Sequence, residues 1–338
     1  MQVEFGIWDH FERRPDIPVE SQYRQKVDLL CQAERLGFRG YHLAEHHLTS
    51  LDLAPSPNLF LAALAQATTR LRIGSMVHIL PLYHPVRLVQ EVCMLDHLSG
   101  GRLDLGIGRG ARATEHEWFG IPPSESARRQ EEILKILISA LSTGNLAFEG
   151  EFYRIGDALL DLLPVQRPHP PLWYAGSPEF PGPRGLNFFG RGAEAVSRYW
   201  ELWDSAAERE EPHALGVGAP RVGITKHVVV RRTEEEAVAV ARRAWPVFAS
   251  NWAATSLRTP DGRVVPEQPD FDLVLQEGDR LLVGTPATVT RYLEPLLERF
   301  RDRPTFYFAP AVQWGDITYQ EALESLELLA AEVFTPLA

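Results

Sequence analysis

The sequence of 338 residues has little cysteine and no long apolar run. Its two cysteines, Cys31 and Cys93, each lie in an amphipathic helical pattern, so the chain has neither a disulfide framework nor a thiolate metal cluster. Both are expected to be small buried core residues. No stretch reaches the roughly 18 uninterrupted apolar residues of a membrane-spanning helix, and no signal-peptide pattern stands at the N-terminus. We therefore expect a cytoplasmic protein.

Positive charge is also scarce. The chain has 34 Lys and Arg against 45 Asp and Glu, which gives a formal net charge of -11. A nucleic-acid backbone or an anionic membrane surface would be repelled, so neither is expected as a partner. A composition of 45% hydrophobic and 23% charged residues is that of an ordinary globular protein. A small organic substrate fits these values better than a polyanion.

Apolar runs of strand length alternate with stretches of helical period. The runs expected to be strands are Val3–Trp8, Gly40–Ala44, Leu71–Val77, Leu103–Ile107, Leu172–Ala175, Gly185–Phe189, Gly223–Val230 and Pro304–Phe308. The helical patterns between the first of them are Ser21–Leu36, Ser56–Ala67 and Pro85–Leu98. This alternation predicts a parallel sheet of α/β class, and eight strands favour closure into a (β/α)8 TIM barrel. Because such barrels often exceed roughly 250 residues, one domain is expected over residues 1–338.

Three segments depart from the alternation. Residues 247–282 show no regular period, so we expect a long insertion there, before the last strand, that acts as a lid. Residues 147–155 are expected to form a hairpin around Glu149-Gly150. The proline-rich stretch 177–184 has room for hardly one helical turn. One outer helix of the barrel is therefore expected to be missing.

Glu45, His46 and His47 follow the second expected strand. Barrel active sites lie at the C-terminal ends of the strands, and a histidine beside a carboxylate can transfer protons near neutral pH. His46 and Glu45 are therefore the candidate catalytic residues. A packed, hydrogen-bonded pair and a metal site both remain open as alternatives. We expect no metal, because hydrolytic metal barrels need further ligands and the first strand is followed only by Asp9-His10.

The sequence Gly106–Gly110, Gly-Ile-Gly-Arg-Gly, follows the fourth expected strand and is expected to be a turn. Glycines let a backbone approach a ligand closely, and a guanidinium can bind a phosphate in a bidentate way. Gly108, Arg109 and Gly110 are therefore candidate cofactor-binding residues. The pattern is not the dinucleotide fingerprint, which needs its glycines to open a helix directly after the first strand of a βαβ unit. A flexible barrel rim with a solvent-exposed arginine remains the alternative.

Gly74, Ser75, Met76 and Val77 stand at the end of the third expected strand. They place two small residues and then a flexible thioether at the barrel mouth, and a flat ring system could lie against such a wall. These four residues are therefore candidates for cofactor binding. Met76 taken alone fits a core position better than a ligand contact.

Together these motifs resemble the bacterial luciferase-like flavin-dependent monooxygenases. The block from residue 70 to residue 110 resembles the family in Gly74-Ser75, Leu80-Pro81, His84–Arg87, Leu95–Arg102 and Gly106–Gly110. Similar matches are found in Ala44–His47 after the second strand, and in Val283–Pro286 and Ser325–Leu329 near the C-terminus. The resemblance covers most of the chain and is loosest in the middle third.

The resemblance implies roles for particular residues. His46 matches the active-site histidine proposed as a general base near the flavin ring. Arg109 matches the arginine that pairs with the FMN phosphate, and Ser177 matches a serine that contacts the same phosphate. Ala175 and Gly176, directly before that serine, complete the expected cofactor-binding set. Met76-Val77 falls where luciferase has a non-proline cis peptide bond beside the flavin ring.

Two positions depart from the family pattern. Gly108 stands where luciferase itself has a reactive cysteine, so a light-emitting luciferase is not expected. Phe180 occupies what looks like a phosphate-contacting threonine position, and the helix after Ser177 is cut short. A helix N-terminus helps to bind anions, so part of the usual phosphate site is expected to be lost.

The resemblance implies an FMN-dependent monooxygenase that uses reduced FMN as a cosubstrate. A separate flavin reductase would supply the reduced FMN, and dioxygen would serve to oxygenate a small organic substrate. Three alternatives remain open: a deazaflavin-dependent dehydrogenase on the same barrel, a flavin-poor binding or accessory protein, and, last, a metal-dependent hydrolase. Family members usually pair through the second and third barrel helices, so the resemblance also implies a homodimer through residues 56–67 and 85–98.

Overall fold

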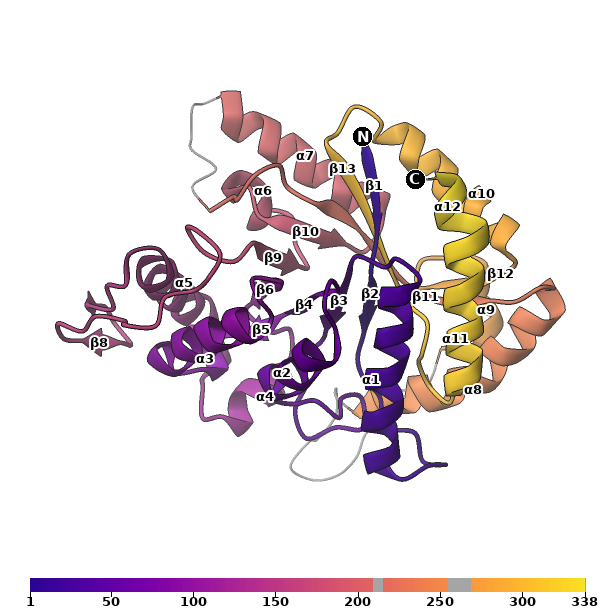
Figure 1. Ribbon diagram of the computed structural model, residues 1–338, viewed down its shortest axis with the longest axis horizontal. Helices are drawn as coiled ribbons and strands as arrows, with labels where there is room; N and C mark the ends of the chain where they lie inside the picture. The colour runs from indigo at the N-terminus through magenta and orange to yellow at the C-terminus, as the bar shows by residue number, and fades with distance from the viewer. Residues whose placement is uncertain (209–214, 255–268, 338) are drawn as a thin grey trace.

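A ring of parallel strands forms the centre of the structure, a computed structural model that describes residues 1–208, 215–254 and 269–337 (Figure 1). The described residues contain, inside and outside this ring, the strands β1 (Gln2–Phe5), β2 (Ile7–Asp9), β3 (Gly40–Leu43), β4 (Arg72–Ser75), β5 (His78–Ile79), β6 (Leu103–Gly108), β7 (Phe148–Glu149), β8 (Arg154–Ile155), β9 (Leu172–Ala175), β10 (Asn187–Gly190), β11 (Val222–Val230), β12 (Leu281–Gly284) and β13 (Thr305–Ala311).

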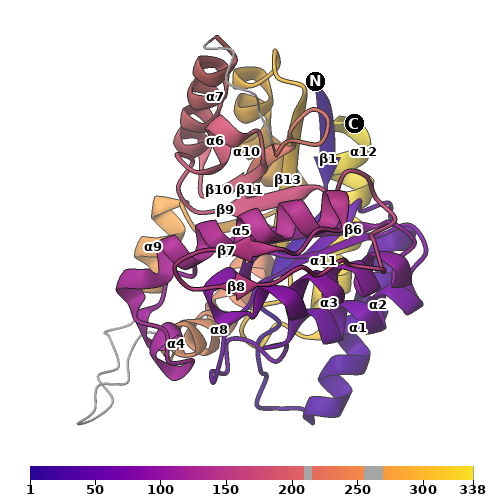
Figure 2. The same cartoon turned by 90° about the vertical axis from the view of Figure 1, so that its left-hand side faces the viewer.

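Helices surround this ring in both views (Figures 1 and 2). They are α1 (Val19–Arg35), α2 (Pro57–Ala67), α3 (Pro85–Leu98), α4 (Ala113–Trp118), α5 (Ser126–Thr143), α6 (Pro181–Arg184), α7 (Ala193–Glu208), α8 (Glu234–Ala254), α9 (Phe271–Glu277), α10 (Pro286–Arg299), α11 (Tyr319–Leu328) and α12 (Thr335–Leu337). Short helical segments are η1 (Leu80–Leu82), η2 (Pro123–Glu125) and η3 (Leu329–Phe334). None of the described helices is long and apolar enough to cross a membrane.

The ring closes through the first strand, which Gly6 divides into β1 and β2. β1 pairs in parallel with β13, β2 pairs in parallel with β3, and the strands between follow in the order β13, β11, β10, β9, β6, β4 and β3. The Gly6 N–H donates to the carbonyl oxygen of Phe308 at 2.9 Å, which keeps the divided strand in contact with β13. The expected α/β barrel is confirmed, and each of the eight expected strands lies close to its expected place.

Regular elements occupy both ends of the expected insertion over residues 247–282. Its first residues continue α8 to Ala254, and its last residues contain α9 and the start of β12. Pro246 lies inside α8. A proline removes a backbone hydrogen bond and normally ends a helical pattern, so the sequence did not indicate that the helix continues. β12 pairs in parallel with the end of β11, outside the ring. Residues 255–268, where most of the expected lid falls, lie outside the described residues.

Two other departures from a regular barrel agree with expectation, and one was not expected. β7 and β8 form the expected antiparallel hairpin, with Phe148 opposite Ile155. Between β9 and β10 the connection holds only the four-residue α6, so the outer helix is shortened as expected. The helices α4 and α5 between β6 and β9 have no counterpart in the sequence-based expectation.

Three helices in the last third begin at side-chain caps. The Asp270 carboxylate accepts hydrogen bonds from the N–H groups of Asp272 and Leu273 at the start of α9. Thr285 caps α10 directly before Pro286, and Thr318 caps α11 in a capping box with Glu321. These local contacts satisfy N–H groups that the first turn of a helix leaves unpaired.

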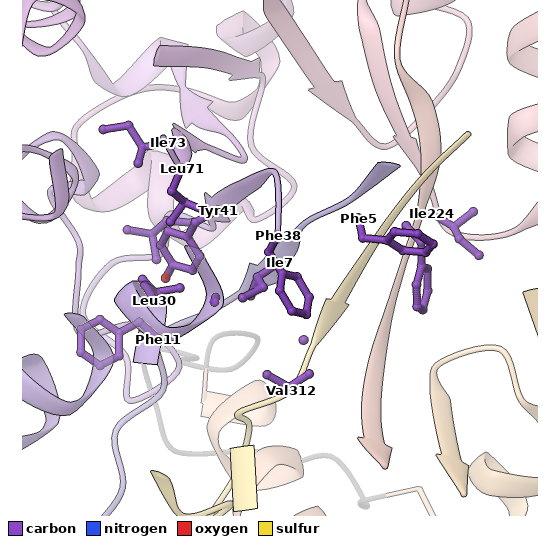
Figure 3. Packing of buried hydrophobic residues seen from close by; sticks show 14 of the residues in the cluster. Phe5, Ile7, Phe11, Leu30, Phe38, Tyr41, Leu71, Ile73, Ile224 and Val312 are labelled. Atoms are coloured by element: carbon purple, nitrogen blue, oxygen red, sulfur yellow. The ribbon is translucent and has the colours of Figure 1, made fainter. Parts of the chain in front are cut away.

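Two apolar clusters fill the molecule. The larger one lies between the strands and the surrounding helices, and Figure 3 shows Phe5, Ile7 and Phe38 beside the strands within it. The smaller one fills the ring itself with Met76, Trp173, Phe189, Tyr307 and Ala309. Cys93 is buried as expected, whereas Cys31 is only half-buried, which corrects its assignment to the core. The ring is therefore a packed core, and ligands must bind at its mouth.

Candidate active site

A cavity of about 500 Å³, called the first cavity below, opens at the C-terminal ends of the strands. Most of the expected site residues line it together: Glu45, His46, Met76, Val77, Gly108, Arg109, Gly110, Ala175, Gly176 and Ser177. The strands β3, β4, β6 and β9 and the segments that follow them supply these residues. Because the C-terminal ends of parallel barrel strands meet at one face, residues far apart in the sequence converge here.

Gly74 and Ser75 do not line the first cavity. Both lie in β4, where a Cβ atom added to Gly74 would come within 2.1 Å of the Asp104 carbonyl oxygen. The Ser75 hydroxyl donates to the carbonyl oxygen of Gly106 at 3.0 Å and contacts His78. Both residues therefore hold β4 against β6 beneath the cavity and do not face a ligand.

His46 is oriented by a carboxylate that the sequence did not reveal. Its Nδ1 donates to Glu115 Oε1 at 3.0 Å, and the same oxygen accepts the His47 backbone N–H at 3.1 Å. Burial by itself raises the pKa of Glu115, but these hydrogen bonds and the His46 ring outweigh it and hold that pKa below its usual value. Glu115 comes from α4, five residues beyond Gly110 in the chain. The signal that the sequence offered for Glu115 was its place shortly after the glycine motif, in what the structure shows to be the first turn of a short helix.

Glu45 has a different set of contacts from the one expected. Its Oε1 accepts from His47 Nε2 at 2.8 Å, and its Oε2 accepts the Ile79 N–H and the Tyr83 hydroxyl, both at 3.0 Å. The residue is 3% exposed. Glu45 therefore orients His47 and ties the end of β3 to β5, while Glu115 orients His46.

A third imidazole, that of His10, also faces the first cavity. Its ring centroid lies 5.3 Å from that of His46, and its buried Nδ1 has no hydrogen-bond partner among the described residues. Burial, followed by the neighbouring His46 and His227, lowers the pKa of His10 well below its usual value, so the ring is uncharged at neutral pH. The adjacent Asp9 turns away and accepts from Lys26 Nζ at 2.5 Å.

Gly108 lies directly against Val77 in the lining of the first cavity. A Cβ atom at Gly108 would come within 2.4 Å of Val77 Cγ2, so no larger side chain fits there. Val77 follows the non-proline cis peptide bond Met76–Val77, which the resemblance implied. Gly106 to Gly108 belong to β6 and not to a turn, which corrects that expectation, because their backbone pairs with β9 and β5. Only Arg109 and Gly110 lie beyond the strand.

The far end of the first cavity has groups suited to an anion. The Arg109 side chain makes no ion pair with any described residue, although it lines the cavity. Gly176 has a φ of 118°, and Ser177 follows it with its hydroxyl hydrogen-bonded to Glu179. Phe180 stacks on Tyr174 with ring centroids 4.7 Å apart. This aromatic pair stands at the start of the shortened α6.

The residues present fit a flavin mononucleotide. The absence of a side chain at Gly108 beside Val77 leaves room for a planar ring system, and the Arg109 guanidinium, which makes no ion pair with any described residue, and the Ser177 hydroxyl suit a phosphate. The cavity volume lies within the range of roughly 300–1,000 Å³ typical of small-molecule sites. Among the described residues, no group of three or more His, Cys, Asp and Glu side chains could hold a metal ion.

A family model described as "Luciferase-like monooxygenase" matches residues 3–301. The chain is 35% identical to an uncharacterized protein of Sinorhizobium fredii, over 98% of this chain and 96% of that protein. It is 31% identical to the oxygenase component of the flavin-dependent trigonelline monooxygenase of Acinetobacter baylyi, over 75% of this chain and 71% of that protein.

Solved structures share the fold. The monooxygenase RslO1 from Streptomyces bottropensis is 24% identical and superposes with a TM-score of 0.86, covering 99% of this chain and 100% of that one. The oxygenating constituent of 3,6-diketocamphane monooxygenase from Pseudomonas putida, solved with FMN, is 22% identical with a TM-score of 0.77 and 98% of each chain covered. An F420-dependent secondary alcohol dehydrogenase, 16% identical, reaches 0.71 with 98% of each chain covered. At these identities the likeness concerns the fold alone.

Proposed function

This chain belongs to the luciferase-like monooxygenase family, and we propose that it is the oxygenating component of a two-component, FMN-dependent monooxygenase. The observation that carries the proposal is the first cavity, whose lining combines a histidine oriented by a carboxylate, the small residue Gly108, and Arg109, which has no ion-pair partner among the described residues. The relative from Acinetobacter baylyi is likewise an oxygenase component. The partner of the present chain would be a separate flavin reductase.

Arg109 and Ser177 would hold the phosphate of the cofactor, because a guanidinium and a hydroxyl form charge-assisted hydrogen bonds to phosphate oxygens. Gly108, Gly110 and Gly176 leave room for the backbone to approach the bound group. When bound, reduced FMN supplies the electrons that activate dioxygen for transfer to an organic substrate. The residues around it position the ring and the reacting molecule.

His46 would transfer a proton beside the ring of the bound flavin. Glu115 holds the ring of His46 by Nδ1, so Nε2 is the nitrogen available for this transfer. Glu45 is a positioning residue in this proposal, because its oxygens are engaged by His47, Ile79 and Tyr83. It fixes the position of the His46–His47 segment relative to β5 and Tyr83.

Exclusion of water is the further contribution of this chain. Trp8, Ala44, Met76 and Val77 present apolar surface to the first cavity, and the uncharged His10 adds to it. Few water molecules then compete for the reacting groups, and the electrostatic interactions within the site are stronger. Residues 1–338 would act in this way as a single catalytic domain.

Two other functions have specific observations in their favour. The F420-dependent secondary alcohol dehydrogenase has the same fold, which favours a deazaflavin-dependent dehydrogenase. The shortened α6 and the engagement of Ser177 by Glu179 favour a protein that binds flavin weakly or not at all. Consumption of oxygen with reduced FMN separates the first alternative from the proposed monooxygenase.

Titration with reduced FMN under anaerobic conditions, and with oxidised FMN, tests the proposal. Arg109→Ala should weaken the affinity by on the order of 2 kcal/mol, or about thirtyfold, because it removes a charge-assisted phosphate contact. Arg301→Ala, which removes an exposed arginine on another face, should leave the affinity unchanged. Equal affinities of the wild type and Arg109→Ala would contradict the phosphate role, and no saturable binding of either flavin would favour the accessory protein.

A further inference from the structure

A second cavity, of about 690 Å³, lies beside the first one at the mouth of the barrel. Trp8 lines both cavities and so stands between them. The second cavity is formed by the segment after β10, by residues within β11, by α8 and by the turn before β12, and none of the residues expected from the sequence to form the site lines it. It is therefore a separate compartment next to the proposed flavin site.

Aromatic rings form the walls of the second cavity. Trp8 meets the His227 ring edge-on with centroids 5.7 Å apart, and Phe248 lies 4.5 Å from the same ring. Trp252 lies 6.0 Å from Phe248, and the guanidinium of Arg280 stacks over Trp252 at 5.2 Å. Such walls favour a ligand with a flat apolar body.

Positive charge gathers at this cavity, although the chain as a whole carries a net charge of -11. Arg191, Lys226 and Arg280 line it, and Lys226 Nζ is occupied by the carbonyl oxygens of Gly278 and Asp279. Neither Arg191 nor Arg280 has an ion-pair partner among the described residues. Burial, and after it the charge of Arg191, lowers the pKa of Arg280. An anion between the two guanidiniums would relieve this repulsion.

Two carboxylates also line the second cavity, and neither neutralises the guanidinium pair. Glu194 is held by Arg299, with Oε1 2.7 Å from Nη1. Asp279 is exposed, and its charge acts on Lys226. Once the pair of Glu194 with Arg299 is taken into account, the lining keeps an excess of positive charge. A carboxylate or similar anion is the ligand group that this excess favours.

His227 points to a ligand independently of the arginines. It is 6% exposed, lines the cavity, and its buried Nε2 has no hydrogen-bond partner among the described residues. Burial, and then Arg280 and Lys226, lowers the pKa of His227 to about 3, so the ring is neutral near pH 7. An unpaired buried nitrogen is costly, and a polar group of a ligand would satisfy it.

The second cavity adjoins the reacting groups of the first. The His227 ring is nearly parallel to that of His10, with an interplanar angle of 12° and centroids 6.2 Å apart. His10 in turn lies 5.3 Å from His46. A ligand that rests on Trp8 and His227 is therefore next to the ring that faces His46.

We propose that the second cavity binds the organic substrate, and that this substrate is a carboxylate with a flat apolar body. The carboxylate lies between Arg191 and Arg280, and the body rests on Trp8, Phe248 and Trp252. The oxygenation of this ligand rests on the proposed monooxygenase function, but the binding of the ligand does not. The two can therefore be tested separately.

Binding of 1-naphthoate, compared with its neutral analogue 1-naphthamide, tests the proposal by calorimetry or tryptophan fluorescence. The wild type should bind the carboxylate at least about tenfold more tightly, because only the carboxylate can pair with the guanidiniums. In the double variant Arg191→Gln with Arg280→Gln this preference should disappear. Arg109→Ala, which alters only the first cavity, should keep it.

Three results would overturn the proposal. They are equal binding of the two compounds, no saturable binding of naphthoate at millimolar concentrations, or a preference that is lost in Arg109→Ala and kept in the double variant. FMN titration of the same proteins gives the separate readout. A naphthoate preference without FMN binding would refute the monooxygenase and leave the carboxylate site standing, whereas FMN binding without the preference would do the reverse.

Discussion

Asp104 illustrates at the scale of one residue how the end of the barrel opposite the site is held. It is 1% exposed in β6, and its Oδ1 accepts from Arg72 Nη2 at 2.7 Å while its Oδ2 lies 3.5 Å from Arg39 Nη1. Burial by itself raises the pKa of Asp104, but Arg72 and Arg39 outweigh it and lower that pKa to about 2. The Asp104 carboxylate thus joins β6 to Arg72 in β4 and to Arg39 directly before β3.

Asp104→Asn is expected to lower the free energy of unfolding at pH 7 by roughly 3–5 kcal/mol, because it leaves the largely buried Arg72 without its carboxylate and Arg39 with Glu4 alone. The pKa of Asp104 is lower in the folded state than its usual value of 3.8. Its contribution is therefore present above that value and is lost as the pH falls toward 2. Urea denaturation at pH 7 and pH 3 should show that the difference between wild type and variant shrinks in acid.

Glu298→Gln is the matched control for this prediction. Glu298 pairs with Arg301 at the surface, where its side chain is 70% exposed. Exposed ion pairs contribute less than about 1 kcal/mol, so this variant should unfold close to the wild type. Equal losses of stability in the two variants would show that burial of the Asp104 pair has no special effect.

At the scale of elements, β11 is held by three neighbouring strands. It pairs with β10, β12 and β13, and Gly223 stands opposite Tyr307 of β13. A Cβ atom at Gly223 would come within 1.6 Å of the Tyr307 carbonyl oxygen. The two strands can approach this closely only because residue 223 has no side chain.

Gly223→Ala is expected to destabilise the protein by about 1–3 kcal/mol or more, since β11 and β13 must separate locally to admit a methyl group. Chemical denaturation measures this loss. Gly156→Ala is the control, because no atom lies within 4 Å of the Cβ position at Gly156. A Gly223→Ala variant as stable as Gly156→Ala would indicate that the strands adjust without cost.

At the scale of the whole molecule, one face is unusually apolar. Leu59 of α2 is 76% exposed, Met94 and Leu98 of α3 are 54% and 44% exposed, and Leu159 nearby is 83% exposed. A groove of about 860 Å³ runs among these side chains. Apolar patches of this kind mark contact surfaces, and the family resemblance implies pairing through the same two helices. We propose a homodimer that buries this face.

The double variant Leu59→Glu with Met94→Glu should therefore be monomeric, because it places four charges in the buried centre of a symmetric interface. Sedimentation velocity at several protein concentrations measures the state. Leu273→Glu changes another exposed leucine, 60% exposed in α9, and should leave the dimer intact. A wild-type protein that sediments as a monomer at every concentration would refute the proposal.

Local sequence patterns were sufficient for the architecture and the location of the candidate site. The alternation of strand and helix periods predicts the barrel, and the rule that barrel sites follow the strands predicts that His46 and Arg109 lie at one face, whereas Ser177 was expected there from the family resemblance. These predictions succeed because a strand or a helix is determined by residues adjacent in the chain. They fail where a local signal misleads, as at Pro246 inside α8 and in the short strand β12.

Only the tertiary structure decided which groups act on one another. Glu115 reaches His46 across 69 positions of sequence, while Glu45, its near neighbour, is engaged by His47, Ile79 and Tyr83. Likewise, the second cavity brings Arg191 and Arg280 together from different elements. Periodicity carries no information about such contacts, because they depend on how far each side chain is buried and on which partner reaches it first. The amino-acid sequence by itself determined the barrel and the position of its mouth, and the packing of distant segments determined the chemistry found there.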